Sequence, residues 1–377
     1  MFRILLQQIR RDRITLPIWI LGTAFLLTVT ANSVLTLYGD TGAQILAVAL
    51  ATPALLALRG IPNGDSFGSA VHFQSFAFLA VTIGLMNTFL ASRHGRADEE
   101  KGRRELVAAA PVSRLSPPIA TLILGVLANG LFVVLAVAGY QSAGLDAGGA
   151  ILSATALGVT GFAFLGLGLL AGELTATSRA ANGAGAIIVL LSYALRAGGD
   201  ALGTPDIAKL TLEPAWLSFL SPIGWGQQTL AFTENNWTPV GWIGTLAVAA
   251  IVVALVIHAQ RELGASLLPE RNGRAAATVG LGSAFALAWR LQVPTLISWA
   301  AGSALLGLAL GSLVTAITTS DVDNPAIEAV MNSLGHTQGD LGTALIPAIM
   351  VIVGVLAAAS GLQAVLRMRD EESGGRT

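Results

Sequence analysis

Long apolar runs, separated by short polar and charged stretches, make up almost the whole chain. A helix needs about 20 mostly apolar residues to cross the hydrocarbon core of a bilayer. Eight windows approach or exceed that length: 16–37, 71–90, 118–140, 150–172, 181–195, 240–258, 293–315 and 341–362. The pattern therefore predicts an all-α integral membrane protein, a polytopic helical bundle with about eight transmembrane helices.

The composition agrees with a membrane protein. Apolar residues make up 54% of the 377 positions and charged residues only 11%, whereas a soluble domain is about 25% charged. A soluble core cannot hold this much apolar sequence, so we expect the excess to face lipid. The chain has no cysteine, which excludes a disulfide scaffold, a thiolate metal site and a cysteine nucleophile.

Basic residues alternate between the segments that connect the windows. Cytoplasmic connections of membrane proteins are enriched in Lys and Arg. Of the 21 basic residues, 18 fall on one side of the predicted topology and three on the other. The three are Arg59, Arg196 and Lys209. Both termini are therefore predicted to be cytoplasmic, with the protein in the inner (plasma) membrane.

Two apolar segments on the predicted outer side differ from the spans. The run 43–58 is short and contains Pro53, so we interpret it as an interfacial or re-entrant helix. The segment 197–238 is the longest outer connection, and its aromatic residues favour the membrane–water interface. We expect short helices that dip into the outer leaflet, with three interfacial residues: Trp216, Pro222 and Trp225.

Polar residues inside the windows have two possible roles. Asn32, Gln74, Asn87 and Asn129 could line a substrate path, or they could hydrogen-bond between helices. None of the windows contains paired carboxylates, so an ion-coupled mechanism has no evident relay.

The chain contains an internal repeat, which bears on its domain organisation. One set recurs 280 positions later: Arg10, Thr15, Leu16, Trp19 and Gly22 as Arg290, Thr295, Leu296, Trp299 and Gly302. A second set recurs 272 positions later: Asp98, Glu99, Glu100, Gly102 and Arg104 as Asp370, Glu371, Glu372, Gly374 and Arg376. We divide the chain into a complete six-span permease half, 1–275, and a partial second half, 276–377, with two spans. We expect the second half to be truncated, so that a second permease chain or a homodimer completes the path.

The cytoplasmic connection 93–116 is the most informative segment. Residues 100–110 are charged first and apolar later, and Pro111 follows, so we predict one short amphipathic helix. Such a helix at the membrane surface can dock a soluble partner. The alternative is a solvated loop whose arginines only set the topology. That alternative leaves the clustered acids unexplained, because Asp and Glu contribute little to the positive-inside signal.

Three motifs resemble those of ABC-2 type transporter permeases, in particular the exporter-of-polyketide-antibiotics-like family. They are Glu100-Lys101-Gly102 with Glu105 and Pro111-Val112-Ser113-Arg114; Glu173-Leu174 with Ser178-Arg179; and Leu220-Ser221-Pro222-Ile223-Gly224-Trp225-Gly226-Gln227-Gln228. The resemblance covers the whole chain, although the second half of the family pattern continues through further spans. It implies a type V exporter-like fold, with a coupling helix that sits in a groove of an ATPase.

Carried over by position, the resemblance places the functional residues in two cytoplasmic loops. The ATPase-coupling residues are Glu99, Glu100, Gly102, Arg103, Arg104, Glu105, Pro111 and Arg114, with Asp370, Glu371 and Glu372 in the repeat. The second cytoplasmic loop contributes Glu173, Ser178 and Arg179.

These observations predict the membrane-spanning permease of an ATP-driven exporter of hydrophobic or amphipathic small molecules, drug- or antibiotic-like. The chain lacks a P-loop, because Lys101 is followed by Gly102 and Lys209 by Leu210. We therefore expect no enzyme activity and no cofactor on this chain. Two copies of a separate ABC ATPase subunit, with ATP and Mg, would supply the energy, and lipid rather than nucleic acid is the other partner. The alternatives are an ion-coupled secondary transporter and a non-transporting, degenerate membrane fragment.

Overall fold

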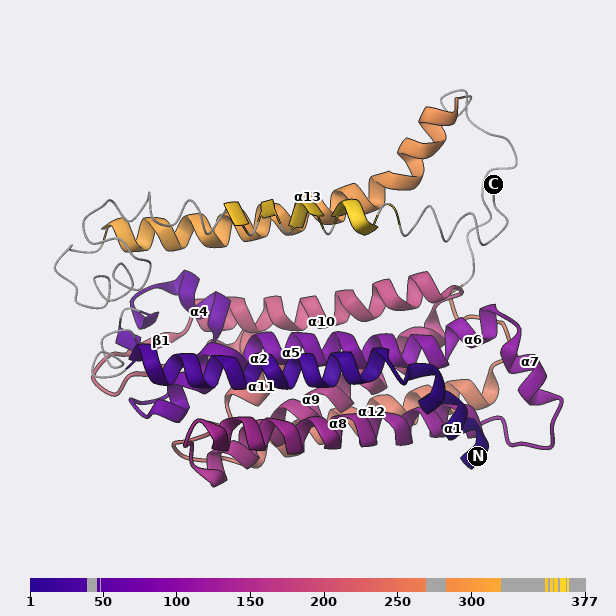
Figure 1. Ribbon diagram of the computed structural model, residues 1–377, viewed down its shortest axis with the longest axis horizontal. Helices are drawn as coiled ribbons and strands as arrows, with labels where there is room; N and C mark the ends of the chain where they lie inside the picture. The colour runs from indigo at the N-terminus through magenta and orange to yellow at the C-terminus, as the bar shows by residue number, and fades with distance from the viewer. Residues whose placement is uncertain are drawn as a thin grey trace. The chain divides into compact units, whose positions relative to one another are not determined.

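The computed structural model describes residues 1–38, 46–268 except 48, 283–319 and most of 350–365. The chain divides into two compact units, Met1–Arg271 and Asn272–Thr377, and we describe each by itself. The predicted boundary at 275 and 276 lies outside the described residues. The long helices of the first unit run side by side along one direction (Figure 1).

Among the described residues, six helices are long and apolar enough to cross a membrane. They are α2 (Thr15–Tyr38), α5 (Phe67–His94), α8 (Ser116–Ser142), α9 (Ala147–Leu174), α10 (Ser178–Ala201) and α12 (Thr238–Gln260). Each contains one of the first six predicted windows. The seventh window lies within α13 (Ala284–Thr319) of the second unit, and the eighth lies largely outside the described residues.

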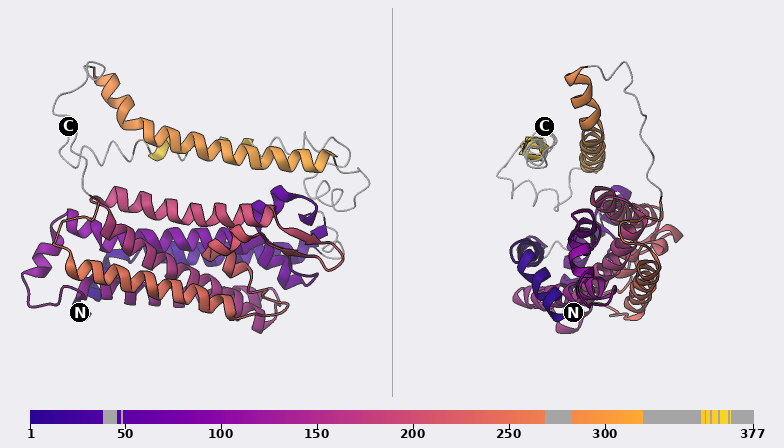
Figure 2. Two further views of the ribbon diagram at one scale, coloured as in Figure 1. Left: turned by 180° about the vertical axis from the view of Figure 1, so that it is seen from behind. Right: turned by 90° about the vertical axis from the view of Figure 1, so that its right-hand side faces the viewer.

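Helices α5 and α9 form the centre of the first unit, as the end-on view shows (Figure 2). Lipid chains are as apolar as leucine, so membrane helices associate through close packing, and small residues permit it. A Cβ added at Gly168 of α9 would lie 2.8 Å from the Cα of Thr88 in α5. The glycine-rich sequence of α9 therefore allows its backbone to approach α5 closely.

Two asparagines close a reciprocal hydrogen-bonded pair between α5 and α8. Asn87 Nδ2 donates to Asn129 Oδ1 at 3.0 Å, and Asn129 Nδ2 donates to Asn87 Oδ1 at 2.9 Å. Both side chains are buried, and Gly161 of α9 leaves room for them. Asn32 instead donates to Thr28 O of its own helix. For Asn87 and Asn129 the geometry favours the helix–helix interpretation over a substrate path.

We expect Asn87→Leu to destabilise the first unit by about 1 kcal/mol, because it removes the hydrogen bonds between the two helices. The loss is measured as a lower unfolding midpoint of the detergent-solubilised protein. Asn32→Leu is the matched control, because Asn32 is exposed and bonds within its own helix. Equal midpoints for the two variants would contradict a stabilising role for the pair.

The short elements of the first unit gather at its two ends (Figure 1). One end carries α4 (Pro53–Arg59), β1 (Thr204–Asp206), β2 (Thr211–Glu213), the 3₁₀ helix η2 (Trp216–Leu220) and α11 (Pro222–Gln227). The other end carries α1 (Phe2–Asp12), α6 (Arg96–Glu100) and α7 (Arg103–Ala108). We call these the α4 end and the α7 end. The segment 197–238 contains the short helices that the sequence predicts, together with an antiparallel hairpin of β1 and β2 that it does not.

The run 43–58 is broken where the structure describes it. The chain is helical before Ala51, and α4 then begins afresh at Pro53, whose fixed φ and missing N–H suit the first turn of a helix. Neither piece is long enough to cross a bilayer. Leu46, Leu50 and Leu56 are nevertheless buried, so this segment packs against the bundle.

A fully buried arginine, Arg196 of α10, caps the C-terminal end of α4 with hydrogen bonds. Its Nη2 donates to Ala57 O at 2.7 Å and its Nη1 to Leu56 O at 3.3 Å. The last carbonyls of a helix have no partner within the helix and carry partial negative charge. Asp200 balances the guanidinium at 3.2 Å and accepts a hydrogen bond from Ser218 of η2 at 3.0 Å. This network joins α4, α10 and η2.

The predicted interfacial residues at the α4 end differ in exposure. Trp216 is 69% exposed. Trp225 is half-buried; it stacks edge-on against Trp242 and donates to Phe219 O at 2.8 Å. Pro222 is buried in the first turn of α11, so it serves packing and does not face the interface.

One contact of the second unit involves a tryptophan of the predicted repeat. Trp299 of α13 donates from Nε1 to Gln363 Oε1 at 2.7 Å, and Gln363 lies in the next helical stretch. Its counterpart in the first unit, Trp19 of α2, packs edge-on against Phe89 of α5. Each of these two tryptophans therefore contacts a residue of another described helical stretch.

Candidate docking surface at the α7 end

The segment predicted as one helix, 100–110, is two helices separated by a turn. Helix α6 ends at Glu100, and α7 begins at Arg103. Gly102 between them has φ of 67°, a left-handed conformation that glycine adopts without steric cost. The single-helix prediction is therefore wrong, because the glycine breaks the helix and redirects it.

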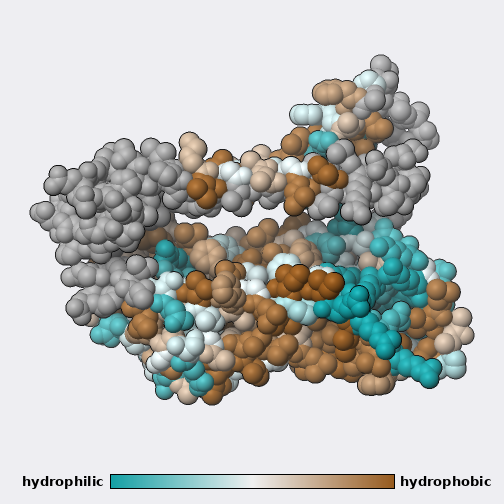
Figure 3. Space-filling model, in the orientation of Figure 1, coloured by the Kyte–Doolittle hydropathy of each residue, from teal (hydrophilic) through white to brown (hydrophobic). Residues whose placement is uncertain are grey.

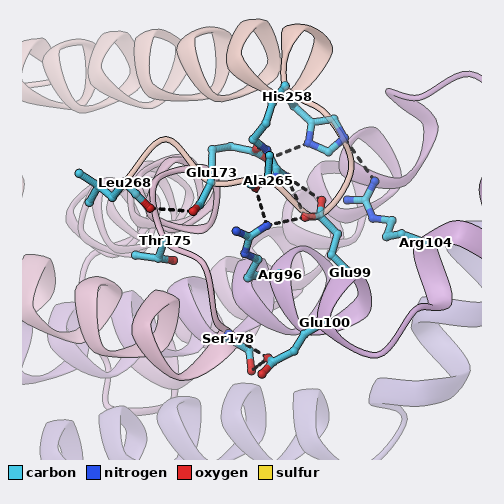
Figure 4. A network of polar contacts seen from close by, with 12 residues as sticks. Arg96, Glu99, Glu100, Arg104, Glu173, Thr175, Ser178, His258, Ala265 and Leu268 are labelled. Atoms are coloured by element: carbon cyan, nitrogen blue, oxygen red, sulfur yellow. Dashed lines mark hydrogen bonds and ion pairs between the residues drawn. The ribbon is translucent and has the colours of Figure 1, made fainter. Parts of the chain in front are cut away.

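A buried ionic network lies beneath α6 (Figure 4). Arg261, just past α12, donates to Glu99 Oε1 at 2.7 Å and to Glu173 Oε2 of α9 at 2.6 Å. Arg96 donates to Glu99 Oε2 at 2.7 Å. Burial lowers the pKa of Arg261, but hydrogen bonds and charges from Glu99 and Glu173 outweigh it and raise this pKa overall. The network joins α6, α9 and the end of α12.

His258 connects this network to α7. Its Nδ1 lies 2.7 Å from Glu173 Oε1, and its Nε2 lies 3.3 Å from Nη1 of Arg104. An arginine can only donate, so Nε2 accepts and Nδ1 carries the proton that Glu173 accepts. Burial lowers the pKa of Arg104, although Glu99 and Glu173 act in the opposite direction. Arg104 is therefore held inside, while Arg103, Glu105 and Leu106 of α7 are exposed.

The chain that follows α12 is tied to the same end of the bundle. Ala265 O accepts a hydrogen bond from Arg96 Nη1 at 2.9 Å, and Leu268 N donates to Leu174 O at 3.1 Å. Arg114 Nη2 donates to Arg261 O at 2.8 Å. These bonds fix the segment 261–268 against α9 and the connection 93–116.

A second ionic cluster, centred on Asp12, attaches α1. Asp12 is buried and lies 2.5 Å from Arg93 Nη1 and 2.6 Å from His94 Nε2, both at the end of α5. Burial opposes ionisation, but His94 and Arg93 outweigh it and hold the pKa of the Asp12 carboxyl below its usual range. Next to it, Arg11 pairs with Asp98 of α6 at 2.5 Å. Sequence reasoning missed Asp12; the only signal was a lone acid within a basic N-terminal segment.

The predicted coupling residues separate into buried and exposed groups. Glu99, Arg104 and Glu173 have buried side chains within the network. Those at the surface are Glu100, Arg103, Glu105, Pro111, Arg114 and Arg179. Asp370, Glu371 and Glu372 lie outside the described residues.

Besides Arg114, two more of the exposed residues are held by neighbours from other elements. Glu100 accepts hydrogen bonds from Ser178 N and Oγ at the start of α10, and Arg103 pairs with Asp98 at 3.2 Å. Leu106, which the sequence reasoning did not single out, is 77% exposed on α7. An exposed leucine beside charged residues is the usual form of an apolar anchor within a polar rim.

The described part of the chain offers no metal site. Among the residues that the structure describes, no group of three or more His, Asp or Glu side chains could hold a metal ion. The histidines there pair with carboxylates or hydroxyls: His94 with Asp12, His258 with Glu173, and His72 with Ser153.

Comparisons with known proteins show that the chain is similar in sequence to a transporter subunit. Residues 281–377 match the family described as the C-terminal domain of multidrug efflux system permease Rv1217c. The chain is 32% identical over 377 residues to the multidrug efflux system permease protein Rv1217c of Mycobacterium tuberculosis. That similarity covers 98% of this chain and 65% of the relative, so the chain spans about two thirds of the relative's length. With six apolar helices among its described residues, the chain is thus a multi-pass membrane protein that resembles, along almost its whole length, an efflux permease.

Proposed function

We propose that this chain is the membrane-spanning permease of an ABC-2 type exporter that moves hydrophobic or amphipathic, drug-like molecules out of the cell. The name of the similar protein, a multidrug efflux system permease, supports this substrate class. Two copies of a separate ABC ATPase, which bind ATP and Mg, supply the energy. The 18-to-3 distribution of basic residues supports a plasma-membrane topology in which the α7 end is cytoplasmic.

One observation carries the proposal: α7 is an exposed helix that a chain of hydrogen bonds connects to the apolar helices. Leu106 projects outward, flanked by Glu105 and followed by the exposed Pro111. Arg104 of α7 hydrogen-bonds to His258 of α12, which hydrogen-bonds to Glu173 of α9. A displacement of α7 by a bound partner would therefore act through these hydrogen bonds on α9 and α12, two of the apolar helices.

An ion-coupled transporter is less well supported by the described residues. Its mechanism needs a titratable group that can exchange an ion along the path. Within the six described apolar helices two carboxylates are buried, and both are paired with cations: Glu173 of α9 with Arg261 and Asp200 of α10 with Arg196. These acids serve ion pairs at the two ends of the bundle.

The docking proposal is tested with Leu106→Glu. We expect co-purification of the proposed partner ABC ATPase to fall roughly tenfold or more, because a central apolar anchor becomes a charge. Stimulation of ATP hydrolysis and ethidium efflux from cells should fall with it. Glu105→Lys is a second, independent change on the same exposed surface.

Leu202→Glu is the matched control, because Leu202 is another exposed leucine, at the α4 end. It should leave ATPase binding unchanged. If Leu106→Glu and Glu105→Lys both retain full ATPase binding and stimulation, α7 is not the docking element and the proposal fails.

A further inference from the structure

Helix α1 lies across the end of the bundle and does not continue the line of α2 (Figure 1). Gln8 Nε2 donates to Thr121 Oγ at 3.0 Å and to Pro117 O at 3.4 Å, both in the first turns of α8. Asp12 anchors its other end to α5. Helix α1 therefore lies at the level where the apolar helices begin, which is the surface of the bilayer.

One flank of α1 is apolar and exposed. Phe2 is 70% exposed and Ile9 of the same helix is exposed as well, as is Ile14 just after the helix ends. Further along the chain this apolar surface passes to α2, where Ile18 and Leu21 are exposed on a membrane-spanning helix and so face lipid. The apolar flank of α1 is thus continuous with a lipid-facing surface.

Three exposed arginines lie along α1 and just after it. Arg3, Arg10 and Arg13 are exposed, and their side chains have no hydrogen bond or ion pair to any residue that the structure describes. Arg11 differs, because it pairs with Asp98. The space-filling view shows hydrophilic residues gathered at this end, next to the apolar flank of the bundle (Figure 3).

We propose that α1 binds anionic phospholipid headgroups through Arg3, Arg10 and Arg13. A helix with an apolar flank and unpaired arginines sinks that flank into the headgroup region and attracts anionic lipid. Each arginine near an anionic surface contributes about 1 kcal/mol, roughly a 5-fold change in binding. Guanidinium groups suit phosphate oxygens because they can donate two parallel hydrogen bonds.

The lipid-binding surface is joined to α6 through charged side chains. Asp12 follows the arginine pair Arg10 and Arg11 and is bonded to the end of α5, while Arg11 pairs with Asp98 of α6. Headgroups that hold α1 in place therefore also hold α5 and α6 in the arrangement described above. This inference does not depend on the proposed ATPase docking, since it concerns only lipid and α1.

The test is the selectivity of the full chain for spin-labelled phosphatidylglycerol over spin-labelled phosphatidylcholine in reconstituted vesicles. We expect Arg3→Gln/Arg10→Gln/Arg13→Gln to lower this selectivity at least roughly 5-fold. Arg179→Gln is the control, because Arg179 is exposed at the same end but lies on α10. Its selectivity should equal that of the unaltered chain. Equal selectivity in the triple variant and the unaltered chain would overturn the proposal.

Two further measurements keep the proposal testable if the triple variant does not insert. Arg10→Gln alone should give a partial loss, and high salt should abolish the selectivity of the unaltered chain because it screens surface charge. Selectivity that survives both changes contradicts the proposal. Added inorganic phosphate separates the two phosphate sources: competition by it would assign the site to free phosphate and overturn the lipid proposal.

Discussion

Arg196→Met is expected to lower the free energy of unfolding of the first unit by about 3–5 kcal/mol, the usual cost of removing one partner of a buried ion pair. The change leaves Asp200 buried without its counter-charge. It also removes the donors to Leu56 O and Ala57 O, so the end of α4 loses two of its caps. The loss is measured by chemical unfolding of the detergent-solubilised chain.

Cysteine labelling at the end of α4 distinguishes loss of the contact between Arg196 and α4 from a general loss of stability. The chain has no cysteine, so a single one can be placed at Leu56, which is buried in the intact structure. Maleimide should label it much faster in the Arg196→Met background. Lys209→Met is the control, because Lys209 pairs with Asp206 at an exposed site, where such pairs contribute little.

The double variant Arg196→Met/Asp200→Leu adds a second comparison. It removes both charges, so we expect it to recover part of the stability that Arg196→Met loses. If Arg196→Met behaves like Lys209→Met in both measurements, Arg196 is not the residue that fastens α4.

Glu173→Ala is expected to have an effect of similar size at the α7 end, again about 3–5 kcal/mol. Glu173 is the common partner of His258 and Arg261, so its loss disconnects both from α9. The segment 261–268 then loses the arginine that ties it to α9. Trypsin cleavage after Arg261 measures this directly and should become faster.

Glu262→Ala is the matched control for Glu173→Ala. Glu262 is the neighbouring acid in sequence to Arg261, but its side chain is exposed. Its removal should change neither the unfolding midpoint nor the cleavage rate. If Glu173→Ala leaves trypsin cleavage as slow as in the Glu262→Ala protein, the segment is fixed by something other than this acid.

The sequence by itself determined where the apolar helices lie. A helix in lipid must satisfy its backbone hydrogen bonds within its own segment and must be apolar along that segment, so the local sequence suffices to locate it. The six windows of the first unit therefore coincide with helices α2, α5, α8, α9, α10 and α12. The sequence also predicts an internal repeat, from matches such as Trp19 with Trp299. The sequence likewise located the acidic-basic segment in the connection between α5 and α8.

Only the tertiary structure decided which of the charged residues face solvent. Glu99 and Glu100 are adjacent and chemically alike, yet Glu99 is buried against Arg261 while Glu100 is exposed beside Ser178. Glu99 and Arg261 are separated by 162 positions, and no local pattern predicts such a pairing. Arg196 shows the same limit, because its role depends on carbonyls of α4 that are about 140 residues away. Hydropathy is a property of neighbours in the sequence, whereas an ion pair is a property of neighbours in space, and only folding brings those together.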